Sequence, residues 1–162
     1  RHPFKEHLTV SPLIQMDEKG KEKMGKAANS SISLKQIHVT DNFWNKYVHL
    51  VKDVIIPYQW DILNDKLEDV ETSHCIENFK IAAGEKEGEF QGAVFQDTDV
   101  AKWLEAVGFV LIYERDEKLE ELADETIELI GRAQQPDGYL NTYFTIKEPD
   151  GRWSNLMEGH KL

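Results

Sequence analysis

Four places in the sequence carry polar side chains that could bind a hydroxyl-rich ligand such as a sugar. Gln59 stands among aromatic residues, Asp97 and Asp99 are paired acids, a polar and aromatic loop covers 134–139, and His160 follows a glutamate and a glycine. Amides and carboxylates form paired hydrogen bonds with hydroxyl groups, and an aromatic ring offers a flat face for stacking. These residue types indicate ligand binding, and each has a structural alternative.

Helix and turn geometry explains part of this set equally well. Asp97 can cap the start of a helix, because its carboxylate accepts hydrogen bonds from free backbone N–H groups. Asp99 is then the acid more open to a ligand, which can be a sugar hydroxyl or a metal. In the 134–139 loop, Asp137 and Tyr139 can hold a sugar, or they can only shape a turn.

Gln59 and His160 also have both a binding and a structural interpretation. A buried amide needs partners, so Gln59 either packs among its aromatic neighbours or faces a polar cavity. A single histidine such as His160 is more often structural than an acid or base. The remaining histidines show no metal-ligand spacing: His2, His7, His38, His49 and His74. The sequence also has no phosphate-binding loop, nucleophile elbow or dinucleotide fingerprint.

Composition narrows the class of partner. The formal net charge of -11 argues against nucleic acid and anionic membranes, because such surfaces need clustered Lys and Arg. The only cysteine, Cys75, excludes an intrachain disulfide and a cysteine-based zinc site within these residues. No apolar run approaches the roughly 18 residues that span a bilayer. No signal peptide is visible, so a cytoplasmic location is expected, although the chain starts at Arg1 rather than Met.

A helical hairpin must position most of the candidate residues. The first predicted helix opens at Asp97 or Thr98, and the second begins after a turn at Arg115-Asp116 and ends before Pro136. Both helices carry apolar residues at three- and four-residue steps, so each has one apolar face. These residues are Val100, Trp103, Leu104, Val107, Val110 and Leu111, followed by Leu119, Leu122, Ala123, Leu129, Ile130 and Ala133. A connection this short forces the two helices to lie antiparallel.

The other segments predict a mainly helical domain with short extended pieces. Residues 1–31 are expected to be a leader or an extended arm, and 32–162 a single helical region. Within it, we expect a strand at 33–39, a helix from 42 to about 67 that bends at Pro57, and a short helix at 74–83. Residues 139–146 are expected to be extended and 148–151 to turn, with Trp153 returning as a small hairpin.

Five sequence blocks resemble the start of the β-L-arabinofuranosidases of glycoside hydrolase family 127. In chain order they are VTDNFW, VIIPYQW, NFKIAAG, FQDTDVAKWLEA and AQQPDGYLNT. The resemblance covers roughly residues 33 to 162 and leaves 1–31 uncovered. It implies an all-α fold that is part of an (α/α)6 toroid, followed by β-sandwich domains outside these residues.

The resemblance also implies an activity, which is retaining hydrolysis of terminal β-L-arabinofuranosides on an oligosaccharide or glycan. The family uses a cysteine thiolate nucleophile, zinc held by cysteines and a glutamate, and a second glutamate as acid/base. None of these groups matches a residue of this chain, so zinc is expected only outside it. The family positions that match are Gln59 and His160 in the sugar pocket, while Asp99, Asp137 and Tyr139 match its mouth less closely. A homodimer through further domains is an additional expectation.

Two alternative functions stay open. The chain can be a non-catalytic sugar-binding or interaction module that has kept the scaffold, or part of a helical hydrolase for other sugars, such as an unsaturated-uronide hydrolase. If the toroid is incomplete, the helices of this chain should leave apolar surface exposed, and we expect this surface at Trp103 and Leu129. Exposed apolar surface of this kind should make the isolated chain self-associate.

Overall fold

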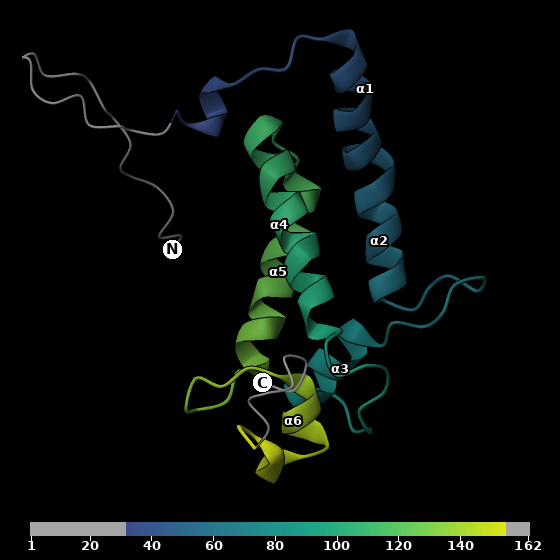
Figure 1. Cartoon of the computed structure of the whole chain (residues 1–162), viewed down its shortest axis with the longest axis vertical. Helices are drawn as coiled ribbons and strands as arrows, with labels where there is room; N and C mark the ends of the chain where they lie inside the picture. Colours follow the sequence, from purple (N-terminus) through teal and green to yellow (C-terminus); the bar gives the residue numbers. More distant parts are fainter. Residues whose placement is uncertain (1–31, 155–162) are drawn as a thin grey trace, which may run out of the picture. The chain divides into compact units, whose positions relative to one another are not determined.

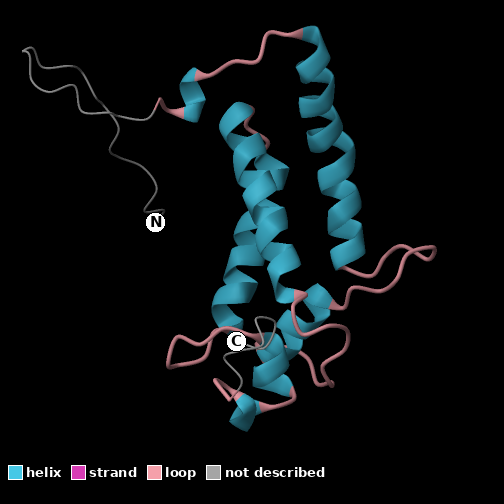
Figure 2. Cartoon of the chain, viewed as in Figure 1, coloured by secondary structure: helices cyan, strands magenta, loops and turns pink. Residues whose placement is uncertain are grey.

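The computed structural model describes residues 32–154, and in these residues every regular element is a helix (Figures 1 and 2). From Leu34 onward they belong to one compact unit. None of the helices in this part of the chain is long and apolar enough to cross a membrane. The elements in chain order are η1 (Leu34–Gln36), α1 (Asn42–Leu50), η2 (Val51–Ile55), α2 (Ile56–Leu63), α3 (Cys75–Ala82), α4 (Asp97–Tyr113), α5 (Glu117–Ala133), α6 (Thr142–Ile146) and η3 (Pro149–Gly151).

The first helical segment runs without a break through α1, η2 and α2. It starts at Asp41, whose carboxylate accepts hydrogen bonds from the backbone N–H groups of Phe43 (2.8 Å) and Trp44 (3.0 Å). The π-helical turn η2 ends two residues before Pro57, which has no N–H to give to the preceding turn. The segment ends at Leu63, short of the predicted residue 67, and the Asn64 side chain donates to the Trp60 carbonyl (2.8 Å) at this end.

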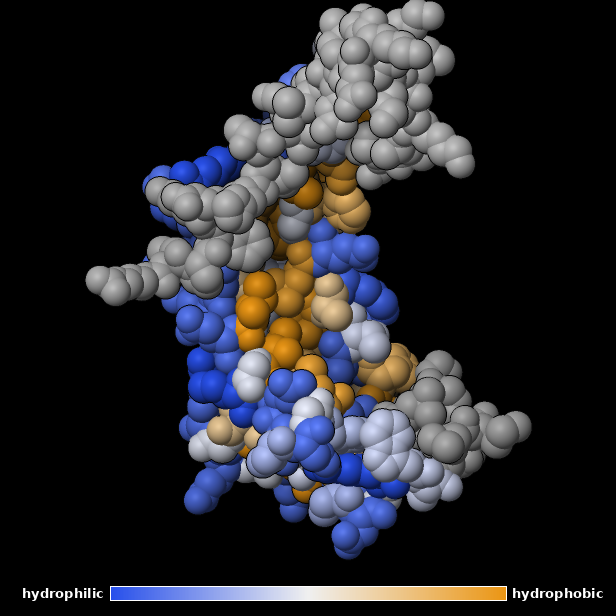
Figure 3. Space-filling view, turned by 90° about the vertical axis from the view of Figure 1, so that its left-hand side faces the viewer, coloured by the Kyte–Doolittle hydropathy of each residue, from blue (hydrophilic) through white to orange (hydrophobic). Residues whose placement is uncertain are grey.

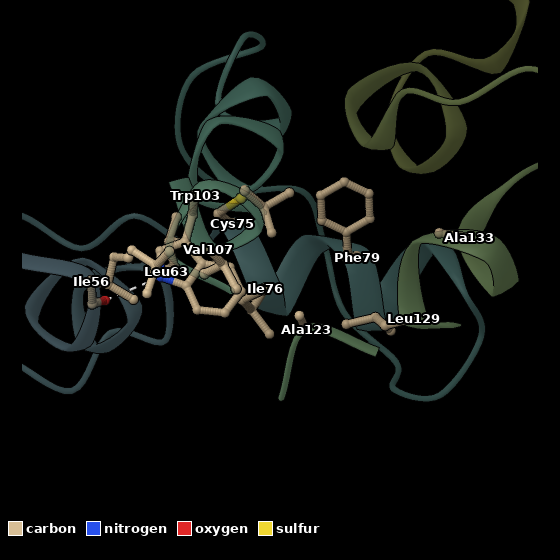
Figure 4. Close-up of a cluster of buried hydrophobic side chains, with 12 residues drawn as sticks. Ile56, Leu63, Cys75, Ile76, Phe79, Trp103, Val107, Ala123, Leu129 and Ala133 are labelled. Atoms are coloured by element: carbon tan, nitrogen blue, oxygen red, sulfur yellow. Dashed lines mark hydrogen bonds between the residues drawn. The ribbon is translucent and has the colours of Figure 1, made fainter. Parts of the chain in front are cut away.

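The predicted hairpin is confirmed as α4 and α5. Asp116 caps α5 by accepting hydrogen bonds from the backbone N–H groups of Lys118 and Leu119, both at 3.1 Å. The short helix α3 packs against α4, α5 and α6, and α2 packs against α4. Figure 4 shows the core that results, in which Trp103 of α4 lies beside Ile56 of α2 while Phe79 of α3 lies near Leu129 of α5.

The expected strands are wrong for the described residues, which contain no strand. Residues 33–39 contain only the short 3-10 helix η1. Residues 139–146 contain α6, because the Asn141 side chain accepts the Phe144 N–H (3.0 Å) and starts a helix there. The 148–151 turn forms, with the Gly151 N–H donating to the Glu148 carbonyl (2.8 Å). Trp153 has a left-handed φ of 62° and lies in a turn, so no hairpin strand returns there.

The exposed apolar surface lies elsewhere than predicted. Trp103 and Leu129 are 4% and 7% exposed, because α2, α3, α4 and α5 cover them within this unit. Exposed instead are aromatic residues of α1 and α4, such as Trp44 and Phe109. They line an apolar groove of about 600 Å³ whose full lining is Val39, Trp44, Tyr47, Val48, Val51, Ala106, Phe109, Val110 and Tyr113. A space-filling view shows an apolar band flanked by hydrophilic residues (Figure 3).

Candidate functional site

A hollow of about 230 Å³ between α2 and the start of α4 brings together two of the predicted site residues. Gln59 comes from α2, and Asp99 comes from the first turn of α4. The two residues are 40 positions apart in sequence, and only the packing of α2 on α4 makes them neighbours of one hollow. Its full lining is Val51, Ile55, Ile56, Gln59, Ile62, Leu63, Ser73, Asp99, Lys102, Trp103 and Ala106.

Trp103 sets the geometry of this hollow. Its indole Nε1 donates a hydrogen bond to the backbone carbonyl of Ile56 (3.1 Å), which Figure 4 marks with a dashed line. Its ring also packs on Trp60, with the two ring centroids 4.5 Å apart. Because Ile56 and Gln59 are less than one turn apart, the buried bond from Trp103 fixes the height of Gln59 relative to α4.

The polar groups at the rim of the hollow are accessible. Gln59 is exposed, and the Asp99 carboxylate pairs with the Lys102 ammonium at 3.0 Å on the surface of α4. The amide can donate and accept, the carboxylate accepts and the ammonium donates. Together they offer the mixed donors and acceptors that a vicinal hydroxyl pair needs, above an apolar floor.

Asp97 has another role than the predicted cap. The residue lies inside α4, whose N-cap is Gln96 without a side-chain cap bond. The Asp97 carboxylate instead accepts the Thr142 backbone N–H at Oδ2 and the Thr142 hydroxyl at Oδ1, both at 2.6 Å. Burial raises the pKa of Asp97 above its ordinary value, against the lowering effect of the two bonds from Thr142.

The 134–139 loop uses much of its polarity to make its own turn. The Gln134 side chain donates to the Gly138 carbonyl (2.9 Å), and Asp137 Oδ1 accepts the Tyr139 N–H (3.0 Å). The Gly138 N–H closes the turn on the Gln135 carbonyl (2.8 Å), with Gly138 at a φ of 87° that favours glycine. Hydrogen bonds that close the turn therefore account for much of the polar character of this loop.

Asp137 and Tyr139 also belong to a second polar and aromatic group. The Arg152 guanidinium lies 4.3 Å from the centre of the Tyr139 ring, and its Nη1 lies 3.3 Å from Asp137 Oδ2. Trp153 meets the same ring edge-to-face at 5.2 Å. Burial raises the pKa of Tyr139. Neither Asp137 nor Tyr139 lines the hollow of Gln59 and Asp99, and His160 lies outside the described residues.

Three polar or aromatic members of the hollow were missed by sequence reasoning. Lys102 had a usable signal, since it stands three residues after Asp99 on a helix and can pair with it. Trp103 was assigned only to the apolar face of its helix, because nothing in the sequence indicates that its indole N–H donates to the Ile56 carbonyl. Ser73 lies in a loop without any motif, so nothing in the sequence places it here.

The described residues do not fit a zinc site. Cys75 is fully buried, and its thiol donates to the Gln96 carbonyl at 3.2 Å. Burial, followed by the nearby negative charge of Asp97, raises the pKa of this thiol to about 12, whereas zinc binds the thiolate. In residues 32–154, no group of three or more His, Cys, Asp and Glu side chains is placed to hold a metal.

Comparisons with known proteins agree on one family. The family model described as "Beta-L-arabinofuranosidase, GH127 catalytic domain" matches residues 36–162. The non-reducing end β-L-arabinofuranosidase of Bifidobacterium longum subsp. longum is 40% identical over an alignment of 142 residues, and the match covers 78% of this chain and 22% of that protein.

Solved structures give the same result. The GH127 β-L-arabinofuranosidase of Geobacillus stearothermophilus is 62% identical with a TM-score of 0.74, over 76% of this chain and 20% of that one. Another GH127 β-arabinofuranosidase is 31% identical with a TM-score of 0.62, over 71% and 18% of the two chains. The chain thus spans about a fifth of the length of the relatives it matches. Because the family model covers most of its residues, the chain belongs to the catalytic-domain family of the GH127 β-L-arabinofuranosidases.

Proposed function

We propose that this chain supplies pocket-wall residues to a retaining glycoside hydrolase that removes terminal β-L-arabinofuranosyl residues. The observation that carries the proposal is the hollow that holds both Gln59 and Asp99, two polar residues of types that bind sugar hydroxyls. Two relatives are β-L-arabinofuranosidases, which supports the choice of sugar.

In this proposal the chain's own residues bind and orient the sugar. The Gln59 amide donates to one ring hydroxyl and accepts from another, while the Asp99 carboxylate accepts from a third. The Lys102 ammonium keeps Asp99 in place at 3.0 Å and balances its charge when water leaves the hollow. His160, Asp137 and Tyr139 are further pocket candidates of the same proposal.

The groups that break the glycosidic bond lie outside these residues in this proposal. Cys75 is a poor thiolate nucleophile, because its sulfur is buried and its pKa is raised to about 12. The nucleophile, the zinc ligands and the acid/base are then contributed by other parts of the catalytic domain, and these 162 residues alone have no hydrolase activity.

The residue composition of α4 supports the finer fold assignment to an (α/α)6 toroid. From Val100 to Tyr113 the only charged residues are Lys102 and Glu105, so α4 is apolar almost all round. A helix of this kind is buried on all sides, as an inner helix of a toroid is. In contrast, α5 has a single apolar face and an outer face with charged residues at Glu117, Glu120, Glu121, Asp124, Glu125 and Glu128.

The test is kinetics of the catalytic domain that contains this chain. We expect Gln59→Ala and Asp99→Ala each to lower kcat/KM for a terminal β-L-arabinofuranoside about tenfold or more, with little change in Tm, because both side chains are on the surface of the hollow. Glu105→Ala is the matched control, an exposed acid of α4 that does not line the hollow. Normal turnover in both variants would refute the proposal.

A separate titration of the chain itself addresses the alternative of a non-catalytic module. Calorimetry with L-arabinose would show binding by these residues alone if they form a complete module. Absence of binding, together with reduced turnover of the Gln59→Ala catalytic domain, supports a pocket wall that needs the remaining residues of the site.

A further inference from the structure

The half-buried carboxylate of Asp97 links two parts of the candidate site, and we propose that Asp97 is a positioning residue that fastens the 134–142 segment to the start of α4. The sugar-related part of this inference rests on the proposed function above. The fastening itself rests on hydrogen bonds between residues 45 positions apart.

Both carboxylate oxygens of Asp97 accept hydrogen bonds from one residue. Oδ2 of Asp97 accepts the Thr142 backbone N–H and Oδ1 accepts the Thr142 hydroxyl, each at 2.6 Å. Thr142 is 1% exposed, so water does not compete for these bonds. Hydrogen bonds to a charged acceptor in such a site are stronger than those between neutral groups.

The start of α4 is held independently of Thr142, which makes Asp97 a fixed anchor. The Cys75 thiol donates to the Gln96 carbonyl (3.2 Å), and the Gln96 side chain accepts the Ala93 N–H (2.7 Å). The Asn78 side chain donates to the Gln91 carbonyl (2.8 Å) and accepts the Gln91 N–H (3.2 Å). The loop before α4 is therefore tied to α3 on its other side.

The fastened segment carries Asp137 and Tyr139. Thr142 begins α6 and comes three residues after Tyr139, while Asp97 comes two residues before Asp99. The Gln134 and Asp137 side chains accept or donate within their own turn, and Asp137 also accepts from Arg152, which follows η3 in the same C-terminal part of the described residues. The Asp97–Thr142 pair thus sets where Tyr139 stands relative to Asp99.

Variants of Asp97 can separate positioning from charge. Asparagine keeps the shape, and its Oδ1 can accept the Thr142 N–H while its amide donates to the Thr142 oxygen after the hydroxyl turns. Alanine removes both bonds and leaves the Thr142 N–H buried without its acceptor. A residue that acts through position should be rescued by Asn, whereas a residue that acts through its charge should not.

The first experiment is hydrogen exchange of the 162-residue chain followed by mass spectrometry. We expect Asp97→Ala to speed exchange of the amides in 139–147 about tenfold, with α5 unchanged, and Asp97→Asn to restore most of the protection. Asp99→Ala is the matched control, since Asp99 pairs only with exposed Lys102 among the described residues. Unchanged exchange in Asp97→Ala, or an Asn variant that behaves like the Ala variant, would overturn the proposal.

A milder variant keeps the test decisive if Asp97→Ala does not fold. Thr142→Val removes the hydroxyl bond and keeps the bond from the backbone N–H, so we expect a smaller acceleration in the same segment. Wild-type protection of 139–147 in this variant would count against the proposal.

The second experiment measures KM and kcat in the catalytic domain with the same variants. We expect Asp97→Ala to raise KM for the arabinofuranoside several-fold and Asp97→Asn to restore it, because the pocket wall returns to its place. If exchange responds to Asp97→Ala while Gln59→Ala and Asp99→Ala leave turnover normal, the fastening stands and the proposed function fails. If exchange responds and KM does not, the link to the sugar site is wrong.

Discussion

At the residue scale, Cys75 shows how surroundings decide the chemistry of a side chain. The thiol is fully buried, and it donates to the Gln96 carbonyl. Burial raises its pKa to about 12, and the negative charge of Asp97 acts in the same direction. The thiol thus remains protonated at neutral pH and serves to hold the loop before α4.

This pKa predicts a slow reaction of the folded chain with thiol reagents. Near neutral pH we expect Cys75 to react with an aromatic disulfide at least about a hundredfold more slowly in the folded chain than in urea, because burial suppresses both access and ionisation. The rate should rise with pH throughout the range below about 12. Rapid stoichiometric labelling of the folded chain would contradict the burial of this sulfur.

At the element scale, side-chain caps decide where the helices begin. Asp41 starts α1, Asp116 starts α5, and the Asn141 side chain starts α6. The starts of the first two helices, at residue 42 and after Asp116, were predicted from the sequence. The third was overlooked, because five residues are too few for a helical period to be visible in 139–146, and alternation of aromatic and polar residues there resembles a strand.

The cap of α5 gives a stability prediction. Asp116→Ala removes the acceptor for the backbone N–H groups of Lys118 and Leu119, and we expect it to lower the free energy of unfolding by about 1 kcal/mol. Denaturant unfolding followed by circular dichroism measures this change. Asp124→Ala, an exposed acid farther along the same helix, is the control and should stay within about 0.5 kcal/mol of wild type.

At the scale of the whole molecule, the arrangement of the apolar helix faces determines which apolar surface stays exposed. The helix α4 lies between α2 and α5 and still exposes Phe109 (56%), while α1 exposes Trp44 (60%). These residues line the apolar groove of about 600 Å³ between α1 and α4. Exposed apolar surface of this kind favours association.

Self-association of the isolated chain is therefore expected to proceed through this groove, and not through Trp103 or Leu129. Phe109→Ser and Trp44→Ser should each shift the chain toward monomer in analytical ultracentrifugation. Leu140→Ser is the control, since it removes an exposed apolar residue of the 134–142 segment. A monomeric wild-type chain with a cooperative melt would contradict the expectation.

The sequence by itself determined the helical hairpin, its turn at Asp116, the mainly helical character of the chain and the family. These follow from local signals, namely apolar spacing, caps and motif order, which short stretches of chain carry in full. It also selected Gln59 and Asp99 as candidates by residue type.

Only the tertiary structure decided which candidates share a site and what each carboxylate does. Gln59 and Asp99 line one hollow because α2 packs on α4, and Asp97 binds Thr142 because α3 packs against both α4 and α6. The residues around Asp97 in the sequence carry no sign of Thr142, which is 45 positions away, so the local pattern indicated only a helix cap. The physical reason is that a hydrogen bond depends on distance in space, and the packing of helices that sets this distance is encoded in the whole chain.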